Sequence, residues 1–343
     1  MGDPVVQTVL GPVGPQDLGH TQTHEHLFID VRKPPPPGAS PEFLRRDQED
    51  IRLDNYYYAR RHRISRHSRL DSVVDAKEEI AFYRAAGGGT IVDATPRGLG
   101  RDPRALREVS EASGVHVVMG SGYYIAAHQP PEVAAKSSAE ITREIVDDLT
   151  IGVDGVRAGI IGEIGASWPM HPQEAKVLDA AVKAQRETGA SLLLHPGRDR
   201  RAPIDLIRRV EKAGGDLSRT IMSHVDRTLF SVAELAEVAS TGCVVEFDLF
   251  GQESSHYEYA DIDMPNDATR IDYLIALRDL GRLDRLVIAQ DICHRTHLRK
   301  YGGEGYAHIL ENVVPMMRRK GLSAADIETI TVGNPSSLLS LRL

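Results

Sequence analysis

The chain has 343 residues, with 41 Lys or Arg against 49 Asp or Glu, which gives a formal net charge of −8. Hydrophobic residues make up 41% and charged residues 26%, close to ordinary globular usage. The acidic balance argues against nucleic acid or an anionic membrane as the main partner, because either would favour a basic stripe. No apolar run approaches the roughly 20 residues of a membrane span.

Two cysteines, Cys243 and Cys293, are too few for a disulfide framework and indicate a reducing compartment. The first ten residues have neither the basic nor the apolar region of a signal peptide. We therefore expect a cytoplasmic protein.

Short apolar runs alternate with amphipathic stretches along the whole chain, and such runs are typical of parallel strands buried on both faces. The predicted strands are residues 20–29, 89–94, 115–120, 158–164, 191–195, 220–224, 243–247 and 286–289. Segments with apolar residues three and four positions apart are predicted to be helices. They are residues 73–86, 103–113, 139–149, 172–188, 204–213, 232–240 and 268–280.

Eight strands, each followed by a crossover, indicate an α/β fold of the closed (β/α)8 TIM barrel type, which forms a single domain over residues 1–343. The alternative is an open doubly wound sheet, which usually has a glycine-rich phosphate loop after its first strand. Here Thr23-His24-Glu25-His26 stands in that place. Residues 32–70 interrupt the pattern and begin with four prolines, so we predict a long loop insertion over the barrel mouth.

Residues of the kind that bind metals stand at the ends of five predicted strands, and in a TIM barrel the chemistry takes place at these C-terminal ends. These residues are His24, His26, Glu163, His195, His224 and Asp291. His24 and His26 are two positions apart, so they point to the same side of a strand, while Glu25 points away. Each residue alone has an ordinary explanation, such as a core histidine or a helix N-cap. Five such strand ends together predict a metal site, because burying so many titratable groups without a cation is costly.

The order of these motifs resembles the phosphotriesterase family of the amidohydrolase superfamily. The matching strings are Thr23-His24-Glu25-His26, Gly162-Glu163-Ile164-Gly165, His195, Ser223-His224-Val225-Asp226-Arg227 and Asp291. The chain is most similar to the phosphotriesterase-related branch of that family. This closer likeness is carried by Val6-Gln7-Thr8-Val9-Leu10-Gly11, Ser167-Trp168-Pro169, His195-Pro196-Gly197-Arg198, Asp248-Leu249-Phe250-Gly251, Asp261-Ile262-Asp263-Met264-Pro265, Lys300-Tyr301-Gly302-Gly303 and Gly333-Asn334-Pro335.

The resemblance implies a binuclear metal centre joined by a bridging hydroxide. His24, His26 and Asp291 would hold the more buried ion, and His195 and His224 the more exposed one. The ions would be two divalent cations, with zinc expected and Mn, Co, Fe or Ni as alternatives, since imidazole and carboxylate suit all of them.

A glutamate, Glu163, stands where many members of the family have a carboxylated lysine, and its two oxygens can bridge the ions. This departure puts in doubt any direct transfer of organophosphate activity. The family resemblance also suggests a homodimer.

Two residues are predicted to move protons. Asp291 would accept the proton of the attacking hydroxide and pass it to the leaving nitrogen of an amide, since amines leave poorly unless protonated. His224, with Asp226 nearby in sequence, would relay the proton outwards. The alternative for Asp226 is a salt bridge with Arg227 at the barrel rim.

Three residues are predicted to bind substrate. Tyr124 follows strand three, where similar lactonases have a tyrosine over the metals; the alternative is packing against residues 32–70. Trp168 follows strand four and would line the pocket, or else anchor a rim loop. Arg198, three residues after His195, would bind an anionic substrate tail, because a guanidinium matches carboxylate, sulfonate or phosphate. The loop after Asp291 offers further cationic side chains, namely His294, Arg295, His297, Arg299 and Lys300.

These expectations together describe a metal-dependent hydrolase acting on a small anionic molecule. The first hypothesis is an amidohydrolase for small N-acyl amino acids or amino sulfonates, and the resemblance suggests N-acetyltaurine, which would yield acetate and taurine. The second is an esterase or lactonase with weak phosphotriesterase activity. The third is a binding protein without chemistry, which we would expect to have lost a ligand residue, yet all six positions are filled.

Overall fold

The computed structural model describes residues 3–62, 64–257 and 259–341. Within these ranges eight parallel strands follow one another in chain order around a barrel. They are β3 (His20–Glu25), β6 (Gly88–Asp93), β7 (His116–Met119), β8 (Ile161–Gly165), β9 (Leu192–His195), β10 (Thr220–Met222), β11 (Val244–Phe247) and β12 (Leu286–Ile288). The Gly159 amide donates to the Met119 carbonyl at 2.9 Å beside β7, and the Asp291 amide donates to the His24 carbonyl at 3.1 Å, which closes the ring between β12 and β3. The predicted TIM barrel is confirmed.

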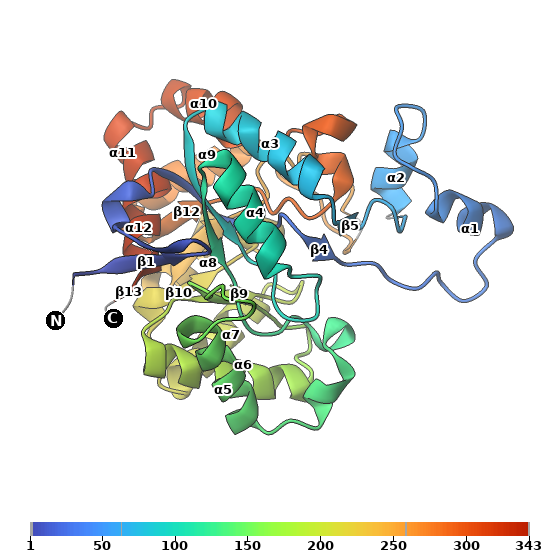
Figure 1. Ribbon diagram of the computed structural model, residues 1–343. Helices are drawn as coiled ribbons and strands as arrows, with labels where there is room; N and C mark the ends of the chain where they lie inside the picture. Colours follow the sequence, from blue (N-terminus) through green and yellow to red (C-terminus); the bar gives the residue numbers. More distant parts are fainter. Residues whose placement is uncertain (1–2, 63, 258, 342–343) are drawn as a thin grey trace.

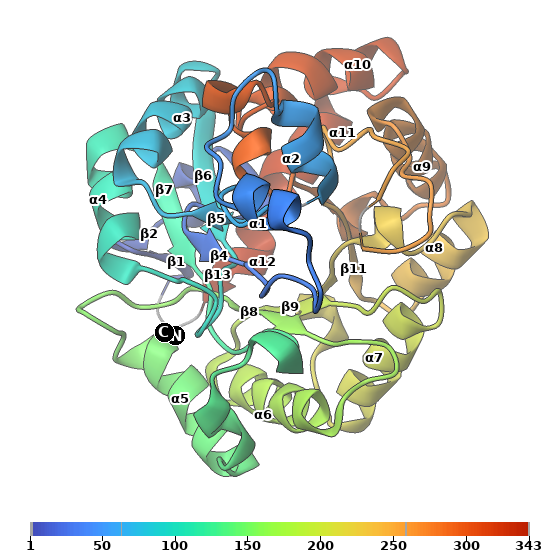
Figure 2. The same ribbon diagram turned by 90° about the vertical axis from the view of Figure 1, so that its right-hand side faces the viewer.

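Helices surround the barrel, and Figure 2 shows them as a ring around its axis. They are α3 (Val73–Ala85), α4 (Pro103–Ser113), α5 (Ser138–Thr150), α6 (Pro172–Thr188), α7 (Ala202–Lys212), α8 (Val232–Ser240), α9 (Asp267–Asp279), α10 (Val314–Arg319) and α11 (Ala324–Glu328). Helix α12 (Asn334–Leu339) instead lies under the barrel, where Leu338 and Leu339 join its core. All seven predicted helices are present, whereas the short α10 to α12 were not predicted. No helix among the described residues combines the length and apolarity needed to cross a bilayer.

The two ends of the chain meet at the side of the barrel opposite its mouth (Figure 1). Strand β1 (Val5–Thr8) forms a hairpin with β2 (Gly11–Val13) and pairs on its other edge with β13 (Ser340–Leu341). These elements were not predicted, because two- to four-residue strands carry too little periodicity.

One inward-facing apolar side chain from each of seven strand regions fills the barrel interior, in the layered manner of TIM barrels. They are Val92, Val118, Ile160, Leu193, Ile221, Val244 and Val287, and all are buried. Val6, Leu18, Leu338 and Leu339 close this core from below. The polar residues at the strand ends lie directly above this apolar layer, so close-packed side chains support them from below.

Residues 32–62 and 64–70 depart from the regular alternation of strands and helices and include α1 (Pro41–Asp47) and α2 (Tyr56–His62). Their far end, β5 (Arg69–Leu70), returns to pair with β4 (Ile29–Asp30). In Figure 2, α1 and α2 lie in front of the barrel mouth. The Tyr56 hydroxyl donates to the Thr296 carbonyl at 3.0 Å and thereby ties this segment to the loop that follows β12.

Replacing Leu193 with Ala tests the layered core. The side chain is fully buried in the barrel interior, so its loss leaves a cavity and should lower the free energy of unfolding by about 2–5 kcal/mol, measured by urea denaturation. The control is Leu280→Ala, where the side chain is 56% exposed and the loss should stay within about 0.5 kcal/mol. Equal, small losses in both variants would contradict the packing described here.

Candidate metal centre

The six strand-end residues predicted as ligands converge on one point at the mouth of the barrel. The Nε2 of His26 lies 3.1 Å from Asp291 Oδ1 and 3.4 Å from Glu163 Oε1. The other carboxylate oxygen of Glu163, Oε2, lies 2.6 Å from His195 Nδ1 and 3.7 Å from His224 Nε2. Glu163 therefore directs Oε1 towards His26 and Oε2 towards His195 and His224.

A glycine is what allows Glu163 to point inwards. Ile160 faces the barrel interior, so strict alternation would turn Glu163 outwards. The pairing of β8 with β9 shifts register between Ile161 and Ile164, and Gly162 takes a φ of +132°. A Cβ on Gly162 would lie 2.5 Å from the Leu193 carbonyl oxygen, so only glycine fits.

Two other cluster residues occupy left-handed backbone positions that non-glycine residues rarely adopt, His224 at φ 53° and Asp291 at φ 49°. A buried carboxylate accepts backbone hydrogen bonds at or beside each of these two residues. The His224 amide donates to Asp248 at 3.0 Å. Glu25 accepts from the amides on either side of Asp291, those of Gln290 at 2.7 Å and Ile292 at 2.9 Å. Glu25 thus points away from the centre, as predicted, but fixes the backbone of Asp291.

The rings of the cluster are oriented for a cation. His24 Nδ1 contacts Asp248 at 3.0 Å and Glu246 at 3.3 Å, while its Nε2 is buried and has no hydrogen-bond partner. His224 Nδ1 likewise contacts Asp248, at 2.9 Å. Metal-binding histidines typically donate their second ring nitrogen to a carboxylate, and a buried polar atom otherwise demands a partner. The donor set therefore fits divalent metal, with His24, His26 and Asp291 within ligand distance of one another.

Electrostatics divide the histidines of the cluster into two kinds. Burial opposes a charge on His24 and His224, but Asp248 raises the pKa of both rings, so a bound cation would displace a proton from each. Burial disfavours a charged His195 and, together with the neighbouring His224, holds its pKa well below the ordinary value, so the ring is neutral. Burial opposes the charge of Glu163, yet His195 and its hydrogen bond hold the pKa of that carboxyl well below its usual range. A neutral imidazole beside an ionised carboxylate is the form in which both bind a cation.

Glu246 and Asp248 were missed by the sequence analysis, although a signal existed. Val244 faces the barrel interior, and the alternation of β11 carries Glu246 and Asp248 to that same side. This is the i, i+2 pattern that identified His24 and His26. Both carboxylates are fully buried and hold histidines of the cluster, so they act as positioning residues.

A cavity of about 1230 Å³, including its open mouth, lies above the cluster. Tyr124 and Arg198, the predicted substrate-binding residues, both line it. The Tyr124 hydroxyl lies 3.2 Å from His195 Nε2, and Arg198 donates to the Tyr257 hydroxyl at 3.1 Å with its guanidinium 4.7 Å from the Tyr259 ring centroid.

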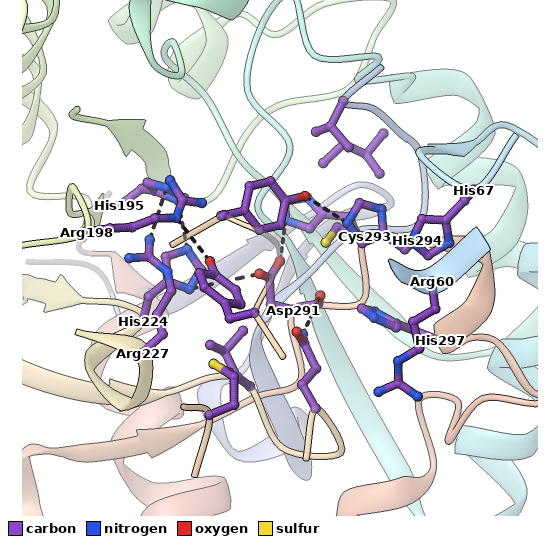
Figure 3. A pocket seen from close by; sticks show the side chains of 18 of the residues that line it. Arg60, His67, His195, Arg198, His224, Arg227, Asp291, Cys293, His294 and His297 are labelled. Atoms are coloured by element: carbon purple, nitrogen blue, oxygen red, sulfur yellow. Dashed lines mark hydrogen bonds and ion pairs between the residues drawn. The ribbon is translucent and has the colours of Figure 1, made fainter. Parts of the chain in front are cut away.

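Figure 3 shows two labelled groups of residues on opposite sides of Asp291. His195, Arg198, His224 and Arg227 form one group, and Arg60, His67, His294 and His297 lie in the other. Residues 32–70 thus contribute directly to the wall of the cavity.

Trp168 does not line this cavity. The Arg201 guanidinium packs 5.1 Å from its ring centroid, so the geometry favours the alternative of a loop anchor over substrate contact. Three basic side chains of the loop after Asp291 form ion pairs with acidic residues. These pairs are Arg295 with Asp71, Arg299 with Glu311 and Lys300 with Asp75.

Asp226 makes neither of the predicted contacts. It pairs at 2.8 Å with the fully buried Arg270, while the ring of His224 bonds to Asp248 instead. Arg227 has no ion pair with Asp226 and lines the cavity. A relay from His224 to Asp226 therefore has no geometric support.

A histidine and carboxylate cluster of this kind at the C-terminal mouth of a TIM barrel defines the class of metal-dependent hydrolases. The model of the Phosphotriesterase family matches residues 4–339, so the chain belongs to the phosphotriesterase family.

Individual relatives agree with this assignment. The chain is 43% identical to the N-acetyltaurine hydrolase of Bos taurus, over 98% of both chains. It is 42% identical to a phosphotriesterase-related protein of Nematostella vectensis, over 98% of this chain and 99% of that protein. A crystal structure of a resiniferatoxin-binding protein from Rhodobacter sphaeroides is 36% identical, with a TM-score of 0.92, over 98% of this chain and 94% of that one.

Exchanging Asp248 for Asn tests its positioning role. The variant keeps the shape but removes the charge that holds His24 and His224, so affinity for divalent metal should fall about 10- to 100-fold in a competition titration with a chelating dye. Asp226→Asn is the matched control, because it removes an equally buried carboxylate that pairs with Arg270. Wild-type affinity in Asp248→Asn would refute the role.

Proposed function

We propose that the protein hydrolyses the amide bond of small N-acyl amino acids or amino sulfonates, with N-acetyltaurine as the leading substrate. The observation that carries this proposal is Arg198, a guanidinium on the cavity wall that forms no ion pair among the described residues. Its position suits an anionic group close to the reacting centre. The similarity to N-acetyltaurine hydrolases supports the choice of substrate.

The proposed cofactor is a pair of divalent cations, with zinc expected. His24, His26 and Asp291 would hold one ion, His195 and His224 would hold the other, and Glu163 would serve both. When bound, such ions lower the pKa of water and polarise the acyl oxygen of a substrate.

Asp291 is the proposed proton shuttle. Its side chain is 16% exposed, whereas those of the four cluster histidines are at most 5% exposed, so it is the cluster member most open to the cavity. From there its carboxylate takes the proton of the attacking water and delivers it to the leaving nitrogen. An amide needs this delivery, because an unprotonated amine is a poor leaving group. The products are a carboxylic acid and a free amine.

A lactonase or carboxylesterase on the same centre is the second candidate function. The favouring observation is Tyr124, whose hydroxyl lies 3.2 Å from His195 Nε2 at the floor of the cavity. That hydroxyl can donate a hydrogen bond to a ring oxygen, and an alkoxide leaves with less help than an amine.

Substrate profiling separates the two functions. The metal-loaded protein should hydrolyse N-acetyltaurine, measured as released taurine, at least tenfold more efficiently than simple γ- and δ-lactones. Exhaustive chelation should abolish turnover, and added divalent metal should restore it. Strong lactone turnover without any activity on N-acetylated acids would overturn the amidohydrolase proposal.

Arg198→Ala tests how the substrate is recognised. Loss of one charge-assisted contact should raise KM about tenfold or more for anionic N-acyl substrates but less than about threefold for neutral acetate esters, measured by initial rates. Arg201→Ala is the control, because that guanidinium stands on the same loop with a 73% exposed side chain. An equal rise of KM for both substrate classes would refute the role of Arg198.

A further inference from the structure

Arg227 is a second arginine at the wall of the cavity, and the sequence analysis gave it no part in the site. Only 2% of its surface is exposed, and it lines the cavity together with Arg198. Figure 3 shows both residues on the same side of Asp291, beside His195 and His224.

Neither guanidinium forms an ion pair with a carboxylate of the described residues. Arg227 donates to the Pro196 carbonyl at 3.0 Å, to the Thr228 hydroxyl at 3.2 Å and to His195 Nε2 at 3.2 Å. A buried guanidinium beside a half-buried one, with no carboxylate partner for either in the described part of the chain, is costly, and an anion between them removes that cost.

We propose that Arg198 and Arg227 together form a subsite for a three-oxygen anion, which selects amino sulfonates over amino carboxylates. The inference rests on the proposed function, because it assigns the anionic end of that substrate. A carboxylate has two coplanar oxygens, which a single guanidinium fork can occupy. A sulfonate has three oxygens in a pyramidal arrangement, so the second guanidinium can donate to a third oxygen, which a carboxylate lacks.

The group of Arg60 and three histidines across the cavity does not offer the same chemistry. Arg60 shares its wall with three imidazoles, and His294 there bonds to the Tyr259 hydroxyl at 2.9 Å. Arg227, by contrast, contacts the cluster directly through His195 Nε2. The pair Arg198 and Arg227 is therefore the one placed to hold a substrate whose scissile bond lies at the centre.

The decisive comparison uses two substrates that differ only in the anion, N-acetyltaurine and N-acetyl-β-alanine. In the metal-loaded wild type, kcat/KM should favour the sulfonate. Arg227→Met should reduce that preference about ten- to hundredfold, mostly through the sulfonate, and Arg227→Lys should reduce it less. Arg200→Met is the matched control, since its side chain on the same loop is 62% exposed and faces Glu234 at 3.4 Å. It should leave the ratio unchanged.

Binding without turnover provides a second readout. Calorimetry with propane-1-sulfonate and butanoate should give a dissociation constant that weakens about tenfold or more for the sulfonate in Arg227→Met, and less than about threefold for butanoate. Thermal unfolding checks that each variant is folded; if the Met variant is not, Arg227→Lys and Arg227→Gln replace it.

The two readouts separate the subsite from the proposed function. An unchanged preference and unchanged sulfonate binding in a folded Arg227 variant would overturn the subsite, even if N-acetyltaurine is hydrolysed. Arg227-dependent sulfonate binding in a protein that hydrolyses neither substrate would support the subsite and overturn the amidohydrolase function.

Discussion

Burial of many ionisable groups at the barrel mouth imposes the strictest requirement on this fold. Four imidazoles and several carboxylates share a region from which water is almost excluded, and such groups are tolerated only when each is paired or binds a cation. The rings of His24 and His224 meet this requirement with their two nitrogens. In each ring one nitrogen, such as the unpartnered Nε2 of His24, faces the other ligand atoms, while the second nitrogen contacts the carboxylate of Asp248. The cluster is therefore positioned before any cation arrives.

That positioning depends on backbone conformations that local sequence preferences oppose. His224 and Asp291 occupy left-handed positions, and Glu163 needs the positive φ of Gly162 to turn inwards. Conformations of this kind persist only where surrounding contacts over-determine them. Here the contacts are hydrogen bonds from strand-end amides to buried carboxylates, among them Glu25. Stability and the geometry of the centre are coupled through the same interactions.

Chemistry and recognition reside in different parts of the molecule. The ligand cluster belongs to strand ends above a close-packed core, where positions are rigid. The cavity wall comes largely from loops and from residues 32–70, including Arg60 and His67. Loops tolerate change far better than strands do, so members of one family can keep the centre and alter the substrate. The position of Arg227 beside His195 is where the two parts meet.

Both the barrel and the set of residues at its mouth follow from the sequence pattern. Alternating apolar runs predict parallel strands, and the parallel strands of a barrel bring their C-terminal ends to one place, so the histidines and carboxylates at those ends meet there. The sequence pattern does not give the partner of each residue. Asp226 pairs with Arg270 and not with Arg227, which lines the cavity; Trp168 packs against Arg201, and Asp248 contacts two histidine rings. Strand periodicity sets the face on which a side chain lies, whereas its partner depends on elements far away in the chain.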